Sequence, residues 1–157
     1  NLPAEGLRSV AQALTRAIEG AQEQRSEYWA NRLLPYLRNI WPKTREKITP
    51  GISESLARLC IATGPEVFPE ALGLLQPWLQ PVQYCDYLLN LLHNAKLCEE
   101  CPADALTFLD LVVGDAEQWL PRKLQECLDD IQRIDANLVD DPRFIRLSEL
   151  IRRRAVV

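Results

Sequence analysis

Residues 68–95 read FPEALGLLQPWLQPVQYCDYLLNLLHNA and contain two apolar stripes separated by a short segment rich in proline. The first stripe consists of Phe68, Ala71, Leu72, Leu75 and Trp78. The second stripe consists of Cys85, Leu88, Leu89, Leu92 and Ala95. Apolar residues that return every three or four positions indicate a helix with one buried face. This stretch therefore predicts two amphipathic helices with a bend between them.

The same spacing recurs along the whole chain, and no stretch alternates long enough to indicate a half-buried strand. Proline stands where a helix is expected to begin in Thr49-Pro50, Gly64-Pro65, Cys101-Pro102 and Asp141-Pro142. Gly64 and Gly114 stand where helices are expected to end, and the carboxylate of Asp141 is expected to cap the last helix. The sequence predicts an all-α fold of about eight helices.

Tryptophan recurs at Trp41, Trp78 and Trp119, at spacings of 37 and 41 residues, and each is followed within three residues by proline. Short linkers between helices favour antiparallel neighbours. We therefore expect a single domain of 157 residues in which each of these tryptophans fills a space near a bend. Its expected parts are a leading helix at about 4–22, hairpin units at about 26–63, 64–98 and 101–138, and a closing helix at about 142–154.

In this spacing the chain resembles HEAT/armadillo-like α-helical repeats over about residues 26–138. The resemblance implies a superhelical stack, because one hairpin cannot bury its own apolar face and must pack on its neighbours. An irregular helical bundle remains the alternative.

The closing run LVDDPRFIRLSELIRR, residues 138–153, resembles the end of helical C-terminal regions in large uncharacterised bacterial proteins. Some of those proteins carry nucleotide-hydrolysing or NAD-cleaving modules implicated in phage defence. The resemblance implies a scaffold role for this part of the chain.

The composition is that of an ordinary globular protein, with 47% apolar and 25% charged residues. No apolar run approaches the length that spans a bilayer, and no signal segment opens the chain, so we expect a cytoplasmic protein with no membrane contact. The chain begins at Asn1 and contains no methionine, from which we expect a fragment of a larger protein.

The net charge is −4, and the charged side chains are unevenly distributed along the sequence. Residues 25–58 hold seven basic side chains against three acidic ones, whereas residues 64–142 hold fifteen acidic side chains against four basic ones. From Arg143 onward there are five arginines and one glutamate. The sequence thus predicts an acidic middle between two basic ends.

The sharpest chemical candidate is a cluster of possible zinc ligands. It consists of Cys85, His93, Cys98 and Cys101. The two-residue gap between Cys98 and Cys101 allows two thiolates to hold one metal ion, and His93 is the only histidine. Only one tight ligand pair is present, so we favour structural thiols, with a metal site or a redox pair as alternatives. The odd count of five cysteines also favours reduced thiols over disulfides.

Catalytic motifs are missing from the sequence. It contains no nucleophile elbow and no glycine-rich phosphate loop, and its adjacent carboxylates Asp129-Asp130 and Asp140-Asp141 are better read as a solvated face and a helix cap. We therefore expect no enzyme activity, no catalytic residue and no cofactor.

Two binding functions remain. We favour a scaffold or protein-interaction module whose partner is a protein, or another domain of the same polypeptide, of basic charge. The alternative is a nucleic-acid-contacting domain that uses the basic ends. The residues of that alternative are Lys43, Arg45, Lys47, Arg143, Arg146, Arg152, Arg153 and Arg154.

Overall fold

A computed structural model describes residues 4–39, 49–115 and 120–155. Throughout these ranges the regular elements are helices and no strand is present, which confirms the all-α fold. The chain divides into two compact units, Asn1–Leu79 and Gln80–Val157. The boundary between them falls inside the predicted hairpin unit of residues 64–98, and the grouping of helices into superhelical repeats stays a prediction.

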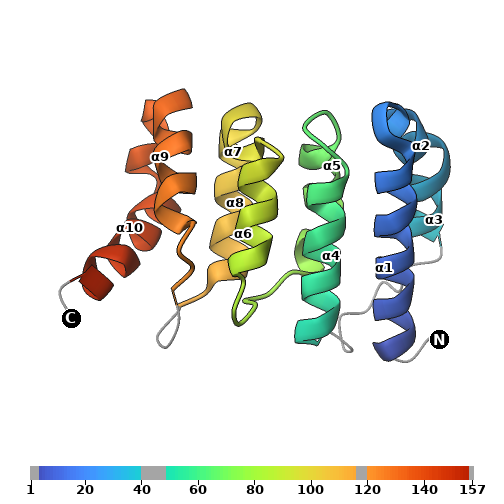
Figure 1. Ribbon diagram of the computed structural model, residues 1–157, viewed down its shortest axis with the longest axis horizontal. Helices are drawn as coiled ribbons and strands as arrows, with labels where there is room; N and C mark the ends of the chain where they lie inside the picture. Colours follow the sequence, from blue (N-terminus) through green and yellow to red (C-terminus); the bar gives the residue numbers. More distant parts are fainter. Residues whose placement is uncertain (1–3, 40–48, 116–119, 156–157) are drawn as a thin grey trace. The chain divides into compact units, whose positions relative to one another are not determined.

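Unit 1 consists of two antiparallel hairpins (Figure 1). Its elements are α1 (Ala4–Ala21), the 3-10 turn η1 (Gln22–Gln24), α2 (Arg25–Tyr28), the π turn η2 (Trp29–Leu33), α3 (Leu34–Asn39), α4 (Pro50–Ala62), α5 (Phe68–Leu75) and the 3-10 turn η3 (Gln76–Trp78). α2, η2 and α3 follow one another as a single rod that returns along α1, and α1 also packs against α4.

Unit 2 also consists of two antiparallel hairpins, one formed by α6 and α8 and the other by α9 and α10 (Figure 1). Its elements are α6 (Asp86–Asn94), α7 (Leu97–Glu100), α8 (Pro102–Val113), α9 (Leu124–Ile134), the 3-10 turn η4 (Ala136–Asp140) and α10 (Pro142–Ala155). α9 packs against α6, α7, α8 and α10. If the α2–α3 rod counts as one helix and the single-turn α7 is left aside, the described residues form eight helical rods, the number that the sequence predicts.

Three of the four predicted helix starts are confirmed, at Pro50, Pro102 and Pro142. The fourth is wrong: Pro65 lies in a turn closed by the N–H groups of Val67 and Phe68 on the Gly64 carbonyl, and α5 begins at Phe68. The Thr49 hydroxyl accepts the backbone N–H of Ile52 at 3.3 Å, with Pro50 as the first residue of α4. The Asp141 carboxylate accepts the backbone N–H of Arg143 at 2.9 Å in the first turn of α10. Both caps satisfy N–H groups that have no partner within their helix.

The predicted helix ends are also confirmed. Gly64 follows the last turn of α4 with φ +88°, and Gly114 follows α8 with φ +60°. Backbone in this region is strained for residues with a side chain. A Cβ at Gly64 would lie only 2.8 Å from the guanidinium of Arg25, which donates to the carbonyl of Ala62. Gly64 therefore lets α2 bind the C-terminus of α4.

The π turn ends at Leu33, two residues before Pro35. Proline has no N–H to donate, and its ring presses on the carbonyl four residues earlier in a regular α-helix. In the π turn the bonding pattern widens, and the N–H of Leu34 donates to the carbonyl of Trp29. Pro35 lies in the first turn of α3, and the widened turn before it accommodates it inside the rod.

Of the three recurring tryptophans, only Trp78 lies in the described residues; Trp41 and Trp119 lie outside them. Trp78 is buried at the bend after α5, and its carbonyl accepts the hydroxyl of Ser53 at 2.8 Å. Trp29, in the π turn, is also buried, with no hydrogen-bond partner for its indole Nε1 among the described residues. The buried position of Trp78 at the bend after α5 agrees with its expected role of filling a space near a bend.

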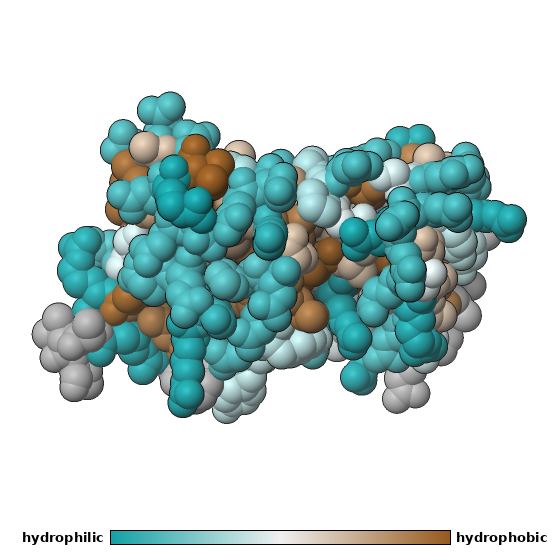
Figure 2. All heavy atoms as spheres, turned by 45° about the horizontal axis from the view of Figure 1, so that its top comes forward, coloured by the Kyte–Doolittle hydropathy of each residue, from teal (hydrophilic) through white to brown (hydrophobic). Residues whose placement is uncertain are grey.

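Each unit buries the apolar side chains of its longer helices, and polar side chains cover most of the surface that Figure 2 presents. Fully buried large side chains include Phe68, Leu72 and Leu75 in unit 1 and Phe108, Leu88 and Leu89 in unit 2. These cores hold the surface helices in fixed positions, and the features described next lie on those helices.

Candidate functional site

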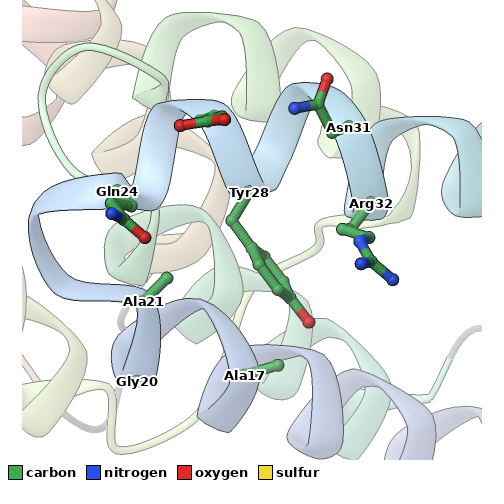
Figure 3. Close-up of a pocket in the computed structure, with 8 residues that line it drawn as sticks. Ala17, Gly20, Ala21, Gln24, Tyr28, Asn31 and Arg32 are labelled. Atoms are coloured by element: carbon green, nitrogen blue, oxygen red, sulfur yellow. The ribbon is translucent and has the colours of Figure 1, made fainter.

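A groove of about 530 Å³ lies between α1 and the rod formed by η1, α2 and η2, wholly within unit 1 (Figure 3). Its lining residues are Ala17, Gly20 and Ala21 from α1 and Gln24, Glu27, Tyr28, Asn31 and Arg32 from the opposite wall. The volume is in the range of ligand pockets. The α1 wall is built of small residues and the other wall of polar ones.

The polar wall is held by buried contacts on its other side. Trp29, Leu33 and Leu37 point into the core of unit 1 and are nearly inaccessible. The Ser26 hydroxyl donates to the Glu66 carboxylate at 2.7 Å, and Arg25 donates to the Ala62 carbonyl at 3.2 Å. The rod is therefore fastened to α4 and its following loop, so that the groove has a fixed wall.

Tyr28 reaches from the rod toward α1 and Ala17, with Gln24 on one side of it and Arg32 on the other (Figure 3). On the α1 side, a Cβ added to Gly20 would meet nothing within 4 Å. The small side chains of α1 thus leave open the space that the phenol and the guanidinium face.

Two charges of opposite sign line the groove. Glu27 and Arg32 are both exposed, and neither has an ion-pair partner within the described ranges. They are five residues apart, and the intervening π turn, with its i to i+5 bonding, brings residues at that separation closer to one face than an α-helix does. The arrangement can accept a ligand that carries both charges.

The four candidate zinc ligands lie in different surroundings. Cys85, Cys98 and Cys101 are buried and form no disulfide, whereas His93 lies on α6 with its side chain partly exposed toward α9. Within the part of the chain that the structure describes, no three or more His, Cys, Asp or Glu side chains are placed to hold a metal ion.

Cys98 has a thiol neighbour that the spacing did not predict. Cys98 on α7 shares a hydrogen bond with Cys127 on α9, and this bond, followed by burial, raises the pKa of the Cys98 thiol. Burial raises the pKa of Cys60 to about 12 and that of Cys85 to about 11, and it also raises the pKa of Cys101. These shifts disfavour the thiolate, the form that nucleophilic attack requires.

His93 faces two carboxylates of the neighbouring helix α9. Its Nε2 lies 3.3 Å from the Asp130 carboxylate and 3.7 Å from that of Glu126, both on α9. Arg133 lies 3.1 Å from Asp130 and 3.3 Å from Glu99. The contacts hold α9 against α6 and α7, a packing role for the single histidine.

Arg143 and Arg146 of the nucleic-acid alternative are bound within unit 2. Arg143 donates to both carboxylate oxygens of Asp141, at 3.0 and 2.9 Å, and to the hydroxyl of Thr107. Arg146 donates to the carboxylate of Asp110 at 2.9 Å, to the carbonyl of the same residue at 3.1 Å, and to the carbonyl of Gly114. Both arginines join α10 to α8.

The other basic residues differ among themselves. Arg152, Arg153 and Arg154 are exposed at the end of α10, where Arg152 lies 2.7 Å from Glu149. Lys43, Arg45 and Lys47 lie outside the described residues. The structure therefore does not bring the eight residues of the alternative together as one described surface.

Comparison of the chain with protein-family models, with curated proteins and with solved structures gave no match. A search of the described helices found none that is long and apolar enough to cross a membrane. The groove of unit 1 is thus the feature on which a functional argument can be built, together with the charged surface of unit 2.

Proposed function

We propose that this chain is a non-catalytic protein-interaction or scaffold module whose acidic surface on unit 2 contacts a basic protein or a basic domain of the same polypeptide. Residues 80–157 contain fourteen acidic and nine basic side chains, a net charge of −5. The observation that carries the proposal is that Arg143 and Arg146 form ion pairs within the unit, with Asp141 and Asp110.

Because those two arginines are engaged, they contribute little free positive potential to the surface. Glu100, Asp115 and Asp129 are exposed on or beside the helices of the same unit. Complementary charge on a partner would accelerate encounter and fix the register of docking. Helices packed on a common core supply a surface that keeps its shape when the partner binds.

A second function, nucleic-acid contact, is favoured by Arg152, Arg153 and Arg154, which end α10 with three consecutive exposed guanidinium groups. Phosphate contacts of this kind release counterions and weaken steeply with salt. The two functions use opposite charges, so one experiment separates them.

The test is affinity purification of the full chain from cells that express it, with chemical cross-linking and mass spectrometry, with and without nuclease. We expect a protein partner to be recovered equally with and without nuclease. The double variant Glu100→Gln, Asp129→Asn should no longer recover it. Glu23→Gln is the matched control, because Glu23 is an exposed carboxylate of unit 1. Release of the bound material by nuclease would instead support the nucleic-acid function, and equal partner recovery with the double variant would overturn the acidic-surface assignment.

A further inference from the structure

The groove of unit 1 has a charge arrangement that calls for a ligand with two opposite charges. The Arg32 guanidinium offers a planar fork of donors that fits a carboxylate. Glu27 lines the same groove and favours a cation next to that carboxylate while repelling a second anion. Complementarity therefore selects one acidic and one basic group over a simple anion.

The remaining polar groups fit a peptide backbone. Gln24 and Asn31 line the groove with carboxamides, each of which both donates and accepts hydrogen bonds as a peptide group does. Tyr28 provides an aromatic face between Gln24 and Arg32, against which the aliphatic part of a side chain can pack (Figure 3). A peptide satisfies these groups together, whereas a small acid reaches only the guanidinium.

We propose that this groove binds an extended segment of a protein partner that carries one acidic and one basic side chain two residues apart. The spacing follows from strand geometry, because side chains two residues apart lie on the same side of an extended chain. The proposal rests on the interaction role proposed above and assigns it a second surface, on unit 1, distinct from the acidic surface of unit 2.

The direct test uses the full chain labelled with ¹⁵N and blocked tripeptides as probes. The mixed-charge probes are acetyl-Lys-Ala-Glu-amide and acetyl-Glu-Ala-Lys-amide, which cover both chain directions. Acetyl-Gln-Ala-Gln-amide, acetyl-Glu-Ala-Glu-amide and acetyl-Lys-Ala-Lys-amide are the comparison peptides, and sodium acetate represents a free small acid. We expect one mixed-charge peptide to shift the amide signals of residues 17–32 and to bind at least fivefold more tightly than any comparison peptide.

A glycine pair provides matched variants. Gly20→Leu places a side chain in the open space of the groove, whereas Gly73→Leu makes the same change on α5, also with nothing within 4 Å and outside the groove. Both variants should fold, since neither added Cβ meets a neighbour. We expect Gly20→Leu to abolish the peptide-induced shifts and Gly73→Leu to leave them unchanged.

Charge variants identify the two recognition groups. Arg32→Gln should weaken binding of the mixed-charge peptide at least fivefold, and Glu27→Gln should remove its advantage over the peptide with two glutamates. Arg16→Gln, an exposed arginine of α1 outside the groove lining, is the control for a change in overall charge.

Three results would overturn the proposal. The first is no shift of these amides by either mixed-charge peptide at 5 mM, the second is equal binding by Gly20→Leu, and the third is equal shifts with acetate. Partner purification with Gly20→Leu distinguishes this inference from the proposed function. A partner retained by Gly20→Leu but lost from the Glu100→Gln, Asp129→Asn variant would refute the groove assignment and leave the interaction role standing.

Discussion

Replacement of Arg146 by methionine tests whether the basic residues of α10 serve the fold. The substitution keeps most of the aliphatic stem and removes the guanidinium, which makes hydrogen bonds to the Asp110 carboxylate, the Asp110 carbonyl and the Gly114 carbonyl. A buried hydrogen bond to a charged group contributes roughly 1.5 to 3 kcal/mol. The Arg146 and Asp110 side chains are each 30% exposed, so water compensates for part of the loss.

We therefore expect Arg146→Met to lower the free energy of unfolding by about 2 kcal/mol, well below the sum of three fully buried bonds. The measurement is urea denaturation followed by circular dichroism at neutral pH. Arg153→Met is the matched control, because Arg153 is exposed on the same helix, and its substitution should change stability by less than about 0.5 kcal/mol.

The pair can be examined further with Asp110→Asn and the double variant. If the two side chains stabilise the unit through each other, the stability losses of the two single variants should add up to more than the loss of the double variant. We expect the difference to be about 1 kcal/mol. A destabilisation of Arg146→Met no larger than that of Arg153→Met would refute the structural role, and it would return Arg146 to the set of arginines free to bind phosphate.

Three further changes test the helix ends and one acidic group. Thr49→Ala should cost about 1 kcal/mol of stability in urea denaturation, because it removes the cap on the Ile52 N–H, and Thr49→Ser should restore most of it; equal stability of the alanine and serine variants would contradict the cap. Gly64→Ala should cost more than about 1 kcal/mol, since φ +88° is strained and the Cβ collides with Arg25, and an unchanged unfolding midpoint would show that the turn relaxes freely. The side-chain and backbone hydrogen bonds from Arg143 lower the pKa of Asp141 to about 2 from its usual 3.8. The ionised Asp141 carboxylate therefore stabilises the fold fully above about pH 4, and this stabilisation is lost as the pH falls through about 2. The stability difference between the parent and Asp141→Asn should accordingly shrink over that interval, and a difference independent of pH would contradict the pairing.

The helix boundaries at Thr49, Gly64, Gly114 and Asp141 were predictable because their causes are local. A proline that follows Thr49 or Asp141 starts a helix through its own fixed φ and its missing N–H, and the preceding side chain reaches a backbone N–H two or three residues away. Gly64 and Gly114 end helices through their own backbone freedom. Each of these signals acts within one helical turn, so the sequence alone carries it.

The partners of the charged and thiol side chains were not predictable because they lie far away in the sequence. Arg146 pairs with Asp110, 36 residues before it, and a basic run read without that partner resembles a phosphate-binding surface. Cys98 and Cys101 have the spacing of a metal pair, but Cys98 shares its hydrogen bond with Cys127 on α9. Tertiary packing decides which nearby residue a side chain faces.

The groove illustrates an intermediate case. Gln24, Tyr28, Asn31 and Arg32 recur at helical spacing, which already marks a polar face, and Pro35 already signals an irregular turn. What the sequence does not show is that the irregularity becomes a π turn, or that the facing wall of α1 is lined by Ala17, Gly20 and Ala21. Large side chains on the facing helix would fill the space beside the polar face. Small side chains there leave room for a ligand. The functional hypothesis for unit 1 therefore depends on the pairing of two helices, which is why a leucine at position 20 is a more decisive test than any change to the polar residues themselves.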